Sequence, residues 1–85
     1  MALDKIPLKD IIGKLVVTKD GKRLGMVKDV TFETRSGELL QLVIKDPTQY
    51  IKTLNLESTG KEYLVPYNTI IAIGDFVVVS EEDLS

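Results

Sequence analysis

The sequence predicts an all-β fold: a small β-barrel, closed or partly open, of about six short antiparallel strands with one short N-terminal helical turn. Three observations lead to this prediction. Short apolar runs rich in β-branched residues recur along the chain, turn-forming residues separate them, and helical character is confined to short segments. The 85 residues make a single domain, 1–85, with its core between about residues 8 and 80.

The composition excludes several classes of site. The chain contains no Cys and no His, which removes disulfides, zinc ribbons, thiol nucleophiles and the commonest general base and metal ligand. No spacing of glycines matches a phosphate-binding loop. We therefore expect no catalytic residue, no metal site and no cofactor, and we expect that the protein is not an enzyme.

Charge and hydropathy indicate where the protein works. Asp4 and Lys5 interrupt the N-terminal segment, whereas a secretory signal needs an unbroken apolar core. No uncharged stretch approaches the roughly 20 residues of a membrane span. The net charge of −2 and the pI of about 5.0 argue against a protein that mainly binds phosphate backbones. We expect a cytoplasmic protein with no membrane span, for which nucleic acid is an unfavourable partner.

The first part of the chain predicts a helical turn followed by a strand. Residues 7–13 begin with Pro, which suits a first helical position, and end with Gly13, where a left-handed residue closes a helix. Residues 14–18 form a short strand with Leu15 and Val17 on one side. A Lys-Asp-Gly-Lys turn then leads into the next strand.

A long hairpin forms the centre of the predicted fold. Residues 24–34 and 39–45 are predicted strands, and the Arg-Ser-Gly-Glu segment between them supplies a turn in which Gly37 can take a positive φ. The apolar alternation of the first strand changes parity near Lys28 and Asp29. A one-residue slip reverses the face of every following side chain unless a bulge absorbs it, so we predict a β-bulge there.

The second hairpin strand and the segment after it do not show a simple alternation of apolar and polar residues. Residues 39–45 are apolar on both parities, which predicts a strand covered on both faces. Residues 46–60 allow two interpretations. Asp46 and Pro47 can cap a short helical turn, or the chain can stay extended and turn back at Gly60.

The last third of the chain predicts three strands. Residues 62–67 form a strand interrupted by Pro66, which lacks an N–H donor and so belongs at an edge or at a strand end. Residues 69–73 and 76–80 form two more strands around a Gly-Asp turn.

This order of segments resembles the PRC-barrel family, a small β-barrel named for the photosynthetic reaction centre and shared with the ribosome maturation factors. The resemblance runs from about residue 8 to residue 80. It rests on glycines and barrel positions: Gly13, Lys14, Gly21, Leu24, Gly25, Val27, Asp29, Gly37, Pro66, Ile73, Gly74 and Asp75. We interpret the glycines as turn, cap or close-packing positions, and the two aspartates as carboxylates that accept backbone N–H groups in turns.

The resemblance implies a binding role. PRC-barrels of known role resemble one another in acting as adaptors, which hold a larger assembly together. Stand-alone chains of this length are similar to archaeal PRC-barrel proteins, some of which take part in cell division. The resemblance therefore implies a non-catalytic scaffold or adaptor with another protein as its partner. The alternative that it implies is a module associated with RNA or the ribosome.

An uneven distribution of charge bears on that alternative. Residues 14–35 hold six basic and three acidic residues. The candidate basic patch comprises Lys19, Lys22, Arg23 and Lys28. One interpretation is that these are solubilising residues around a hairpin, and the other is that they bind an acidic protein tail or RNA.

The C-terminal strand predicts a homodimer, or a standing partner, that covers the outer side of this strand. The segment Phe-Val-Val-Val at residues 76–79 is apolar on both parities, yet a barrel strand turns only one face to the core. Either Phe76 with Val78 or Val77 with Val79 should therefore lie outside, unless the turn at Ile11 and Ile12, or residues 46–60, fold over them. The candidate interface residues are Leu39, Tyr50, Leu54, Ile70, Val77 and Val79.

Overall fold

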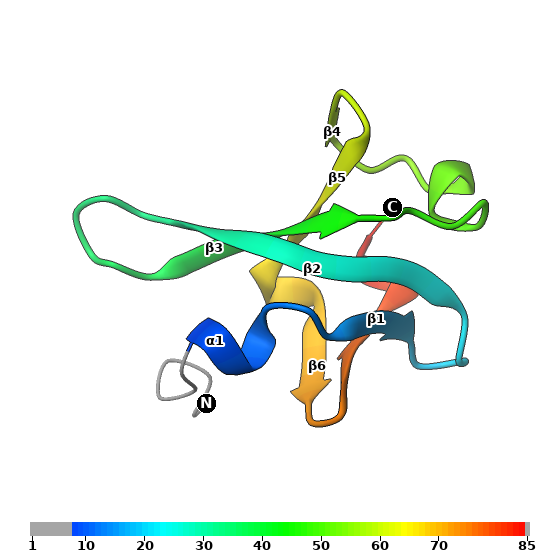
Figure 1. Ribbon diagram of the computed structural model, residues 1–85, viewed down its shortest axis with the longest axis horizontal. Coiled ribbons are helices and arrows are strands. Elements are labelled where there is room, and N and C mark those ends of the chain that lie inside the picture. Colours follow the sequence, from blue (N-terminus) through cyan, green and yellow to red (C-terminus); the bar gives the residue numbers. More distant parts are fainter. Residues whose placement is uncertain (1–7, 85) are drawn as a thin grey trace.

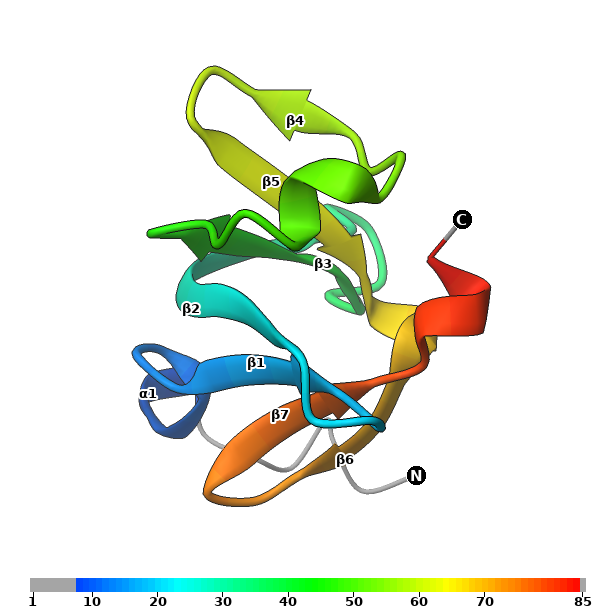
Figure 2. The ribbon, with the colours of Figure 1, turned by 90° about the vertical axis from the view of Figure 1, so that its right-hand side faces the viewer.

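The computed structural model describes residues 8–84, which form one strongly curved sheet of seven strands (Figures 1 and 2). The elements in chain order, with η denoting 3-10 helices, are α1 (Leu8–Ile11), β1 (Leu15–Thr18), β2 (Arg23–Phe32), β3 (Leu39–Lys45), η2 (Ile51–Thr53), β4 (Ser58–Thr59), β5 (Glu62–Pro66), η3 (Tyr67–Thr69), β6 (Ile70–Ile73), β7 (Phe76–Val79) and η4 (Glu81–Asp83). The strand order across the sheet is β4-β5-β3-β2-β1-β7-β6. Strands β4 and β6 end the sheet without pairing to each other, so the barrel is not closed by hydrogen bonds.

The predicted all-β fold is confirmed, with two differences in topology. A short additional strand, β4, pairs with β5, and β1 pairs with β7 in parallel rather than antiparallel orientation. The other neighbouring strands are antiparallel. A tight turn cannot join two parallel strands, so the β1–β7 pair is a contact between distant parts of the chain and has no local sequence signal.

The predicted bulge in β2 is confirmed at Lys28, where the pairing with β3 shifts by one residue between Val27 and Asp29. Val27 before the bulge and Val30 after it are both buried. Without the extra residue, one of the two would face solvent, because strand side chains alternate between faces.

The core lies inside the curve of the sheet. It consists of aliphatic side chains: Ile11, Val16, Leu24, Val27, Val30, Leu42, Ile44, Ile51, Val65, Ile70, Val77, Val79 and Leu84. Ile51 belongs to η2, so residues 46–60 contain the predicted helical turn, and the chain also turns back at Gly60, whose φ is 62°. Thr69 is also buried, and its Oγ1 donates a hydrogen bond of 2.7 Å to the carbonyl oxygen of Pro66.

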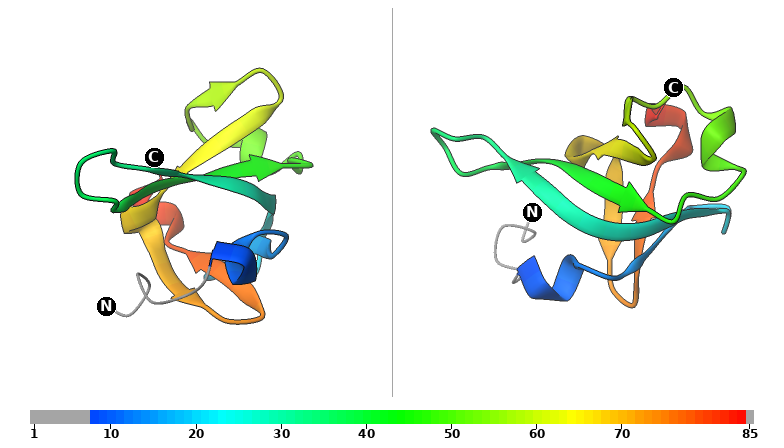
Figure 3. Two further views of the ribbon diagram at one scale, coloured as in Figure 1. Left: turned by 60° about the vertical axis from the view of Figure 1, so that its left-hand side comes forward. Right: turned by 45° about the horizontal axis from the view of Figure 1, so that its top comes forward.

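The prediction that both faces of β3 are covered is wrong. Leu42 and Ile44 are fully buried, whereas Val43 between them, on the other face, is only half-buried. Leu40 is the extra residue of a bulge opposite Thr31 and Phe32 and is 47% exposed. Strand β5 pairs with β3 only from Gln41 to Ile44, and the β2–β3 hairpin projects beyond the body of the barrel (Figures 1 and 3). Leu40 lies on that projection.

The helical turn near the N-terminus is present as α1, and Gly13 follows it with a positive φ of 89°. The predicted helix start at Pro7 lies outside the described residues. None of the helices within residues 8–84 has the length and hydropathy needed to cross a membrane.

Gly25 allows β2 to pass close to the end of β3. A Cβ atom at this position would lie 2.5 Å from Ile44 Cγ2 and 2.8 Å from the carbonyl oxygen of Lys45. Its φ of 152° is also one that side-chain-bearing residues rarely adopt.

We expect Gly25→Ala to lower the free energy of unfolding by at least about 2 kcal/mol, because it adds both overpacking and backbone strain. Gly37→Ala is the matched control, since Gly37 has a φ of 74° and open space around its Cα. Gly37→Ala should lower the free energy of unfolding by only about 1 kcal/mol, because it adds backbone strain without overpacking. Urea unfolding monitored by circular dichroism measures both, and equal losses would contradict the close approach.

Candidate interaction surface

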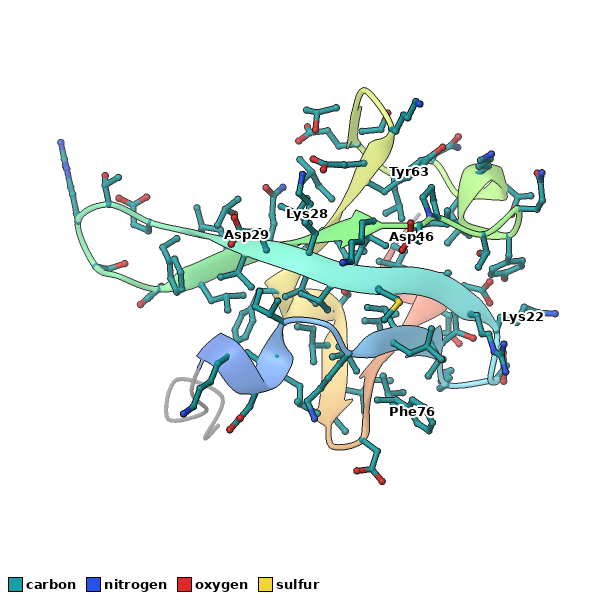
Figure 4. The ribbon with its side chains drawn as sticks, viewed as in Figure 1. Lys22, Lys28, Asp29, Asp46, Tyr63 and Phe76 are labelled. Carbon is teal, nitrogen blue, oxygen red and sulfur yellow. The ribbon has the colours of Figure 1, made fainter. Side chains whose placement is uncertain are left out.

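The structure shows which parity of β7 faces outward. Val77 and Val79 are fully buried, whereas Phe76 is 51% exposed and Val78 is half-buried. Figure 4 shows Phe76 projecting away from the barrel. Of the two segments that could cover this ring, the N-terminal turn buries Ile11 in the core and leaves Ile12 37% exposed, and the other is the segment 46–60. Figures 2 and 3 place that segment beside β3 and β5, away from the β6–β7 hairpin.

Neighbouring strands extend the outward face of β7 into an apolar surface. Residues that pair directly across strands share one face of a sheet. Phe76 pairs with Leu15, which pairs with Met26 on β2. Val78 pairs with Val17 on one side and with Ala72 on the other. We call this surface the outer stripe; its members are Leu15, Val17, Met26, Ala72, Phe76 and Val78.

The outer stripe is partly accessible. Phe76 and Ala72 are exposed, and its other members are half-buried. Ile71 lies beside it as the extra residue of a bulge in β6, and its side chain is 47% exposed. The stripe and the adjacent Ile71 together present two half-exposed large side chains with a continuous apolar surround, a pattern that marks interaction sites on soluble proteins.

Three of the predicted interface residues are placed in the core instead. Val77, Val79 and Ile70 turn inward, so their assignment to an interface is wrong. The remaining candidates, Leu39, Tyr50 and Leu54, are partly buried and pack against the core. For Val77 and Val79 the assignment failed because both parities of β7 are apolar, and its pairing with β1, which decides between them, is a long-range contact.

Several members of the outer stripe were not predicted from the sequence as interface residues. Leu15 and Val17 were predicted to share one side of a strand, and the structure turns that side outward. The buried side consists of Val16 and Thr18. Only the parallel register, which places Leu15 beside Phe76 and Val17 beside Val78, joins these side chains to the C-terminal strand.

The four candidate basic residues do not gather into one patch. Lys22 lies at the β1–β2 turn with its Nζ 5.2 Å from the centre of the Tyr50 ring, whereas Lys28 lies midway along β2 (Figure 4). Lys19 Nζ forms a salt bridge of 3.1 Å with Glu82. Arg23 is exposed at the start of β2. Acidic partners at Lys19 and Lys28 reduce the positive potential that phosphate binding requires.

Lys28 forms the second of these ion pairs, with Glu62 on β5. The hydrogen bond to the Glu62 carboxylate, and next the charge of that carboxylate, raise the pKa of Lys28 above its ordinary value of 10.5. The pair joins strands on either side of β3 and lies on the far side of the molecule from Phe76 (Figure 4).

The two predicted turn carboxylates have different surroundings. Asp29 Oδ1 accepts a hydrogen bond of 2.8 Å from the backbone N–H of Val30. Asp75 instead lines a shallow hollow together with Asp10 and Lys14, and Lys14 Nζ donates a hydrogen bond to the carbonyl oxygen of Gly74 there. Within residues 8–84, no group of three or more acidic side chains is arranged to hold a metal ion.

Comparison with known proteins supports one family. The model of the PRC-barrel domain family matches residues 3–84. An uncharacterized protein of Methanocaldococcus jannaschii is 30% identical over 83 residues, which cover 98% of this chain and 90% of that protein.

We expect Glu62→Gln to lower the urea midpoint slightly and in a salt-sensitive way, because the ion pair is exposed to solvent. Because the pKa of Lys28 is higher in the folded state than its ordinary value, the ion pair contributes its full stabilisation below pH 10.5. This stabilisation is lost as the pH rises through the higher folded-state pKa. The difference between the wild type and Glu62→Gln should therefore vanish in strong alkali.

The matched control for that experiment is Glu57→Gln, at the exposed glutamate that precedes β4. Urea titrations at pH 8 and above the raised pKa measure both variants against the wild type. A Glu62→Gln effect that is unchanged by salt and alkaline pH would contradict an electrostatic role for the pair.

Proposed function

Since the chain belongs to the PRC-barrel domain family, we propose that it is a non-catalytic protein-binding scaffold or adaptor that works as a homodimer. The observation that carries this proposal is the outer stripe, and above all Phe76, a large aromatic side chain that is 51% exposed on an apolar surface. Aromatic side chains are enriched at the centres of protein interfaces.

The magnitude of apolar burial is compatible with self-association. Fully burying a Phe or Ile side chain is worth roughly 1.5 to 3 kcal/mol, so covering the exposed halves of Phe76 and Ile71 contributes roughly 1 kcal/mol each per copy. A two-fold axis doubles every such contact because the same patch is used by both copies. The half-buried members of the stripe add to this sum.

Charges of both signs border the stripe. Lys14 and Asp75 lie beside Leu15 and Phe76, at the ends of β1 and β7 where the stripe begins. A surface that meets its own copy gains from carrying both signs, because a lysine of one copy can approach a carboxylate of the other.

We extend the proposal to assembly of a larger complex, such as cell-division machinery, on the strength of the family resemblance alone. The RNA-associated alternative is not proposed, because two of its four candidate residues are in ion pairs with glutamates.

We expect sedimentation to show a dimer for the wild type and a lower mass for Phe76→Lys, because a charge on the outer stripe opposes its burial. Phe32→Lys is the matched control. Phe32 is 46% exposed but lies on the projecting hairpin, so its substitution should leave the mass unchanged. Circular dichroism should show both variants folded.

Val77→Lys completes the set, since Val77 is the inward neighbour of Phe76 and is fully buried. This variant should unfold, because an unpaired charge cannot be accommodated in the core. A wild type that stays monomeric at high concentration, or an equal loss of mass in Phe76→Lys and Phe32→Lys, would overturn the proposed homodimer.

A further inference from the structure

Residues 46–56 join β3 to β4 and are paired with none of the described strands; we call this segment the strap. Before it, Lys45 pairs with Met26. After it, the carbonyl oxygen of Glu57 accepts a hydrogen bond of 2.9 Å from the backbone N–H of Leu64. Both ends of the strap are therefore fixed to the sheet, while its middle loops out from the end of β3 and contains the single turn η2 (Figures 1 and 2).

The hydrogen bonds that hold the strap against the barrel converge on Thr48. Its backbone N–H donates a bond of 3.1 Å to the carbonyl oxygen of Leu24, and its Oγ1 donates one of 2.6 Å to the carbonyl oxygen of Arg23. The contact of Lys22 with the Tyr50 ring adds a cation–π interaction. Three further backbone N–H groups donate within the strap, those of Lys52, Thr53 and Leu54.

The apolar attachment of the strap is concentrated in one side chain, that of Ile51. It is fully buried and belongs to the same core cluster as Leu24 and Ile44. Three other strap side chains are half-buried and pack against the core: Tyr50, Leu54 and Leu56. The Ile51 backbone N–H also donates a bond of 3.4 Å to Thr48 Oγ1. One buried side chain therefore closes this end of the barrel, and it is linked to the residue that holds the strap in place.

Asp46 begins the strap in a left-handed conformation, with a φ of 51°. Among the described residues, it alone has a positive φ without being glycine. This conformation is unfavourable for L-residues because Cβ approaches the backbone, although Asp tolerates it better than most. Rotation of Asp46 out of this conformation releases strain. The closed strap is therefore held against a backbone preference at the point where it leaves β3.

We propose that the strap opens and closes as a unit on an intact barrel, with Asp46 as the hinge, Thr48 as the latch and Ile51 as the plug. The barrel strands are joined by continuous ladders, whereas the strap depends on one latch and one plug. Segments with few buried contacts open at a lower free energy than the core.

Opening of the strap uncovers an apolar end of the barrel. The fully buried side chains there are Leu24, near the start of β2, and Ile44, near the end of β3. Figures 2 and 3 place the strap beside β3 and β5, away from the β6–β7 hairpin, so this surface is separate from the outer stripe. The inference goes beyond the proposed function and does not rest on the homodimer.

Native-state hydrogen exchange of the wild type tests the opening. The backbone N–H of Thr48 reports on the strap, and that of Val27, which donates a bond of 2.9 Å to the carbonyl oxygen of Lys14, reports on the barrel. After correction for intrinsic rates, the Thr48 N–H should exchange about 100-fold faster or more, with little dependence on sub-denaturing urea, because a local opening exposes little surface. The Val27 N–H should show the full urea dependence of global unfolding.

Thiol labelling tests the plug, since the chain has no cysteine of its own. The variants are Ile51→Cys and, as the matched control, Val65→Cys. Both positions are fully buried, but Val65 lies within β5. Without urea, the Ile51→Cys thiol should react with a thiol reagent about 100-fold faster or more than the Val65→Cys thiol.

A second substitution in the Ile51→Cys variant tests the latch. Thr48→Val should raise the labelling rate about tenfold, because it removes the hydrogen bonds of Oγ1. Thr53→Val is the control, since Thr53 Oγ1 donates its bond of 2.7 Å to the carbonyl oxygen of Tyr50, within the strap. It should leave the rate within about twofold, because a strap that opens as a unit keeps its internal bonds.

Equal exchange of the Thr48 and Val27 N–H groups, with the same urea dependence, would overturn the strap, because both would then report only global unfolding. Equal labelling of the Ile51→Cys and Val65→Cys thiols in folded proteins, or equal acceleration by Thr48→Val and Thr53→Val, would also overturn it. Circular dichroism identifies the folded variants, and the wild-type exchange result stands even where a variant does not fold.

Discussion

Strand β2 takes part in both halves of the sheet, and the remaining strands are placed by the way it bends. Its first residues pair with β1 and its later residues pair with β3. A straight strand of this length would turn half of its apolar side chains to solvent once the sheet curls. The bulge at Lys28 prevents this, and Gly25 lets the strand pass close to the end of β3. The continuous aliphatic core follows from that bend.

Much of this architecture could be predicted from the sequence, because the sequence patterns that indicate it are local. The hairpin turn, the change of parity in β2, the N-terminal helical turn and the strands before and after Gly74 all follow from patterns within about ten residues. The PRC-barrel resemblance is confirmed by the family match. The parallel β1–β7 pair and strand β4 were missed, because the first is long-range and the second has only two residues.

The interaction surface was harder to predict from the sequence, because it too depends on long-range contacts. A strand with valine at three successive positions carries no polarity signal, so its inward face is set by the neighbour it meets. That neighbour is β1, and its own sequence does not distinguish an inward from an outward face either. Leu15 and Val17 lie on one side of β1, and Val16 and Thr18 lie on the other. The ion pairs at Lys19 and Lys28 likewise join residues from distant parts of the chain.

The pairing of β1 with β7 also determines when the outer stripe comes into existence. Leu15 and Phe76 lie near opposite ends of the chain, yet they are neighbours in the folded sheet. Closing so long a loop is entropically costly and slow compared with forming the local β2–β3 hairpin. A nascent chain on the ribosome can therefore form that hairpin early but cannot assemble the outer stripe until its last strand has emerged. The surface proposed for self-recognition is thus present only once β7 has paired with β1.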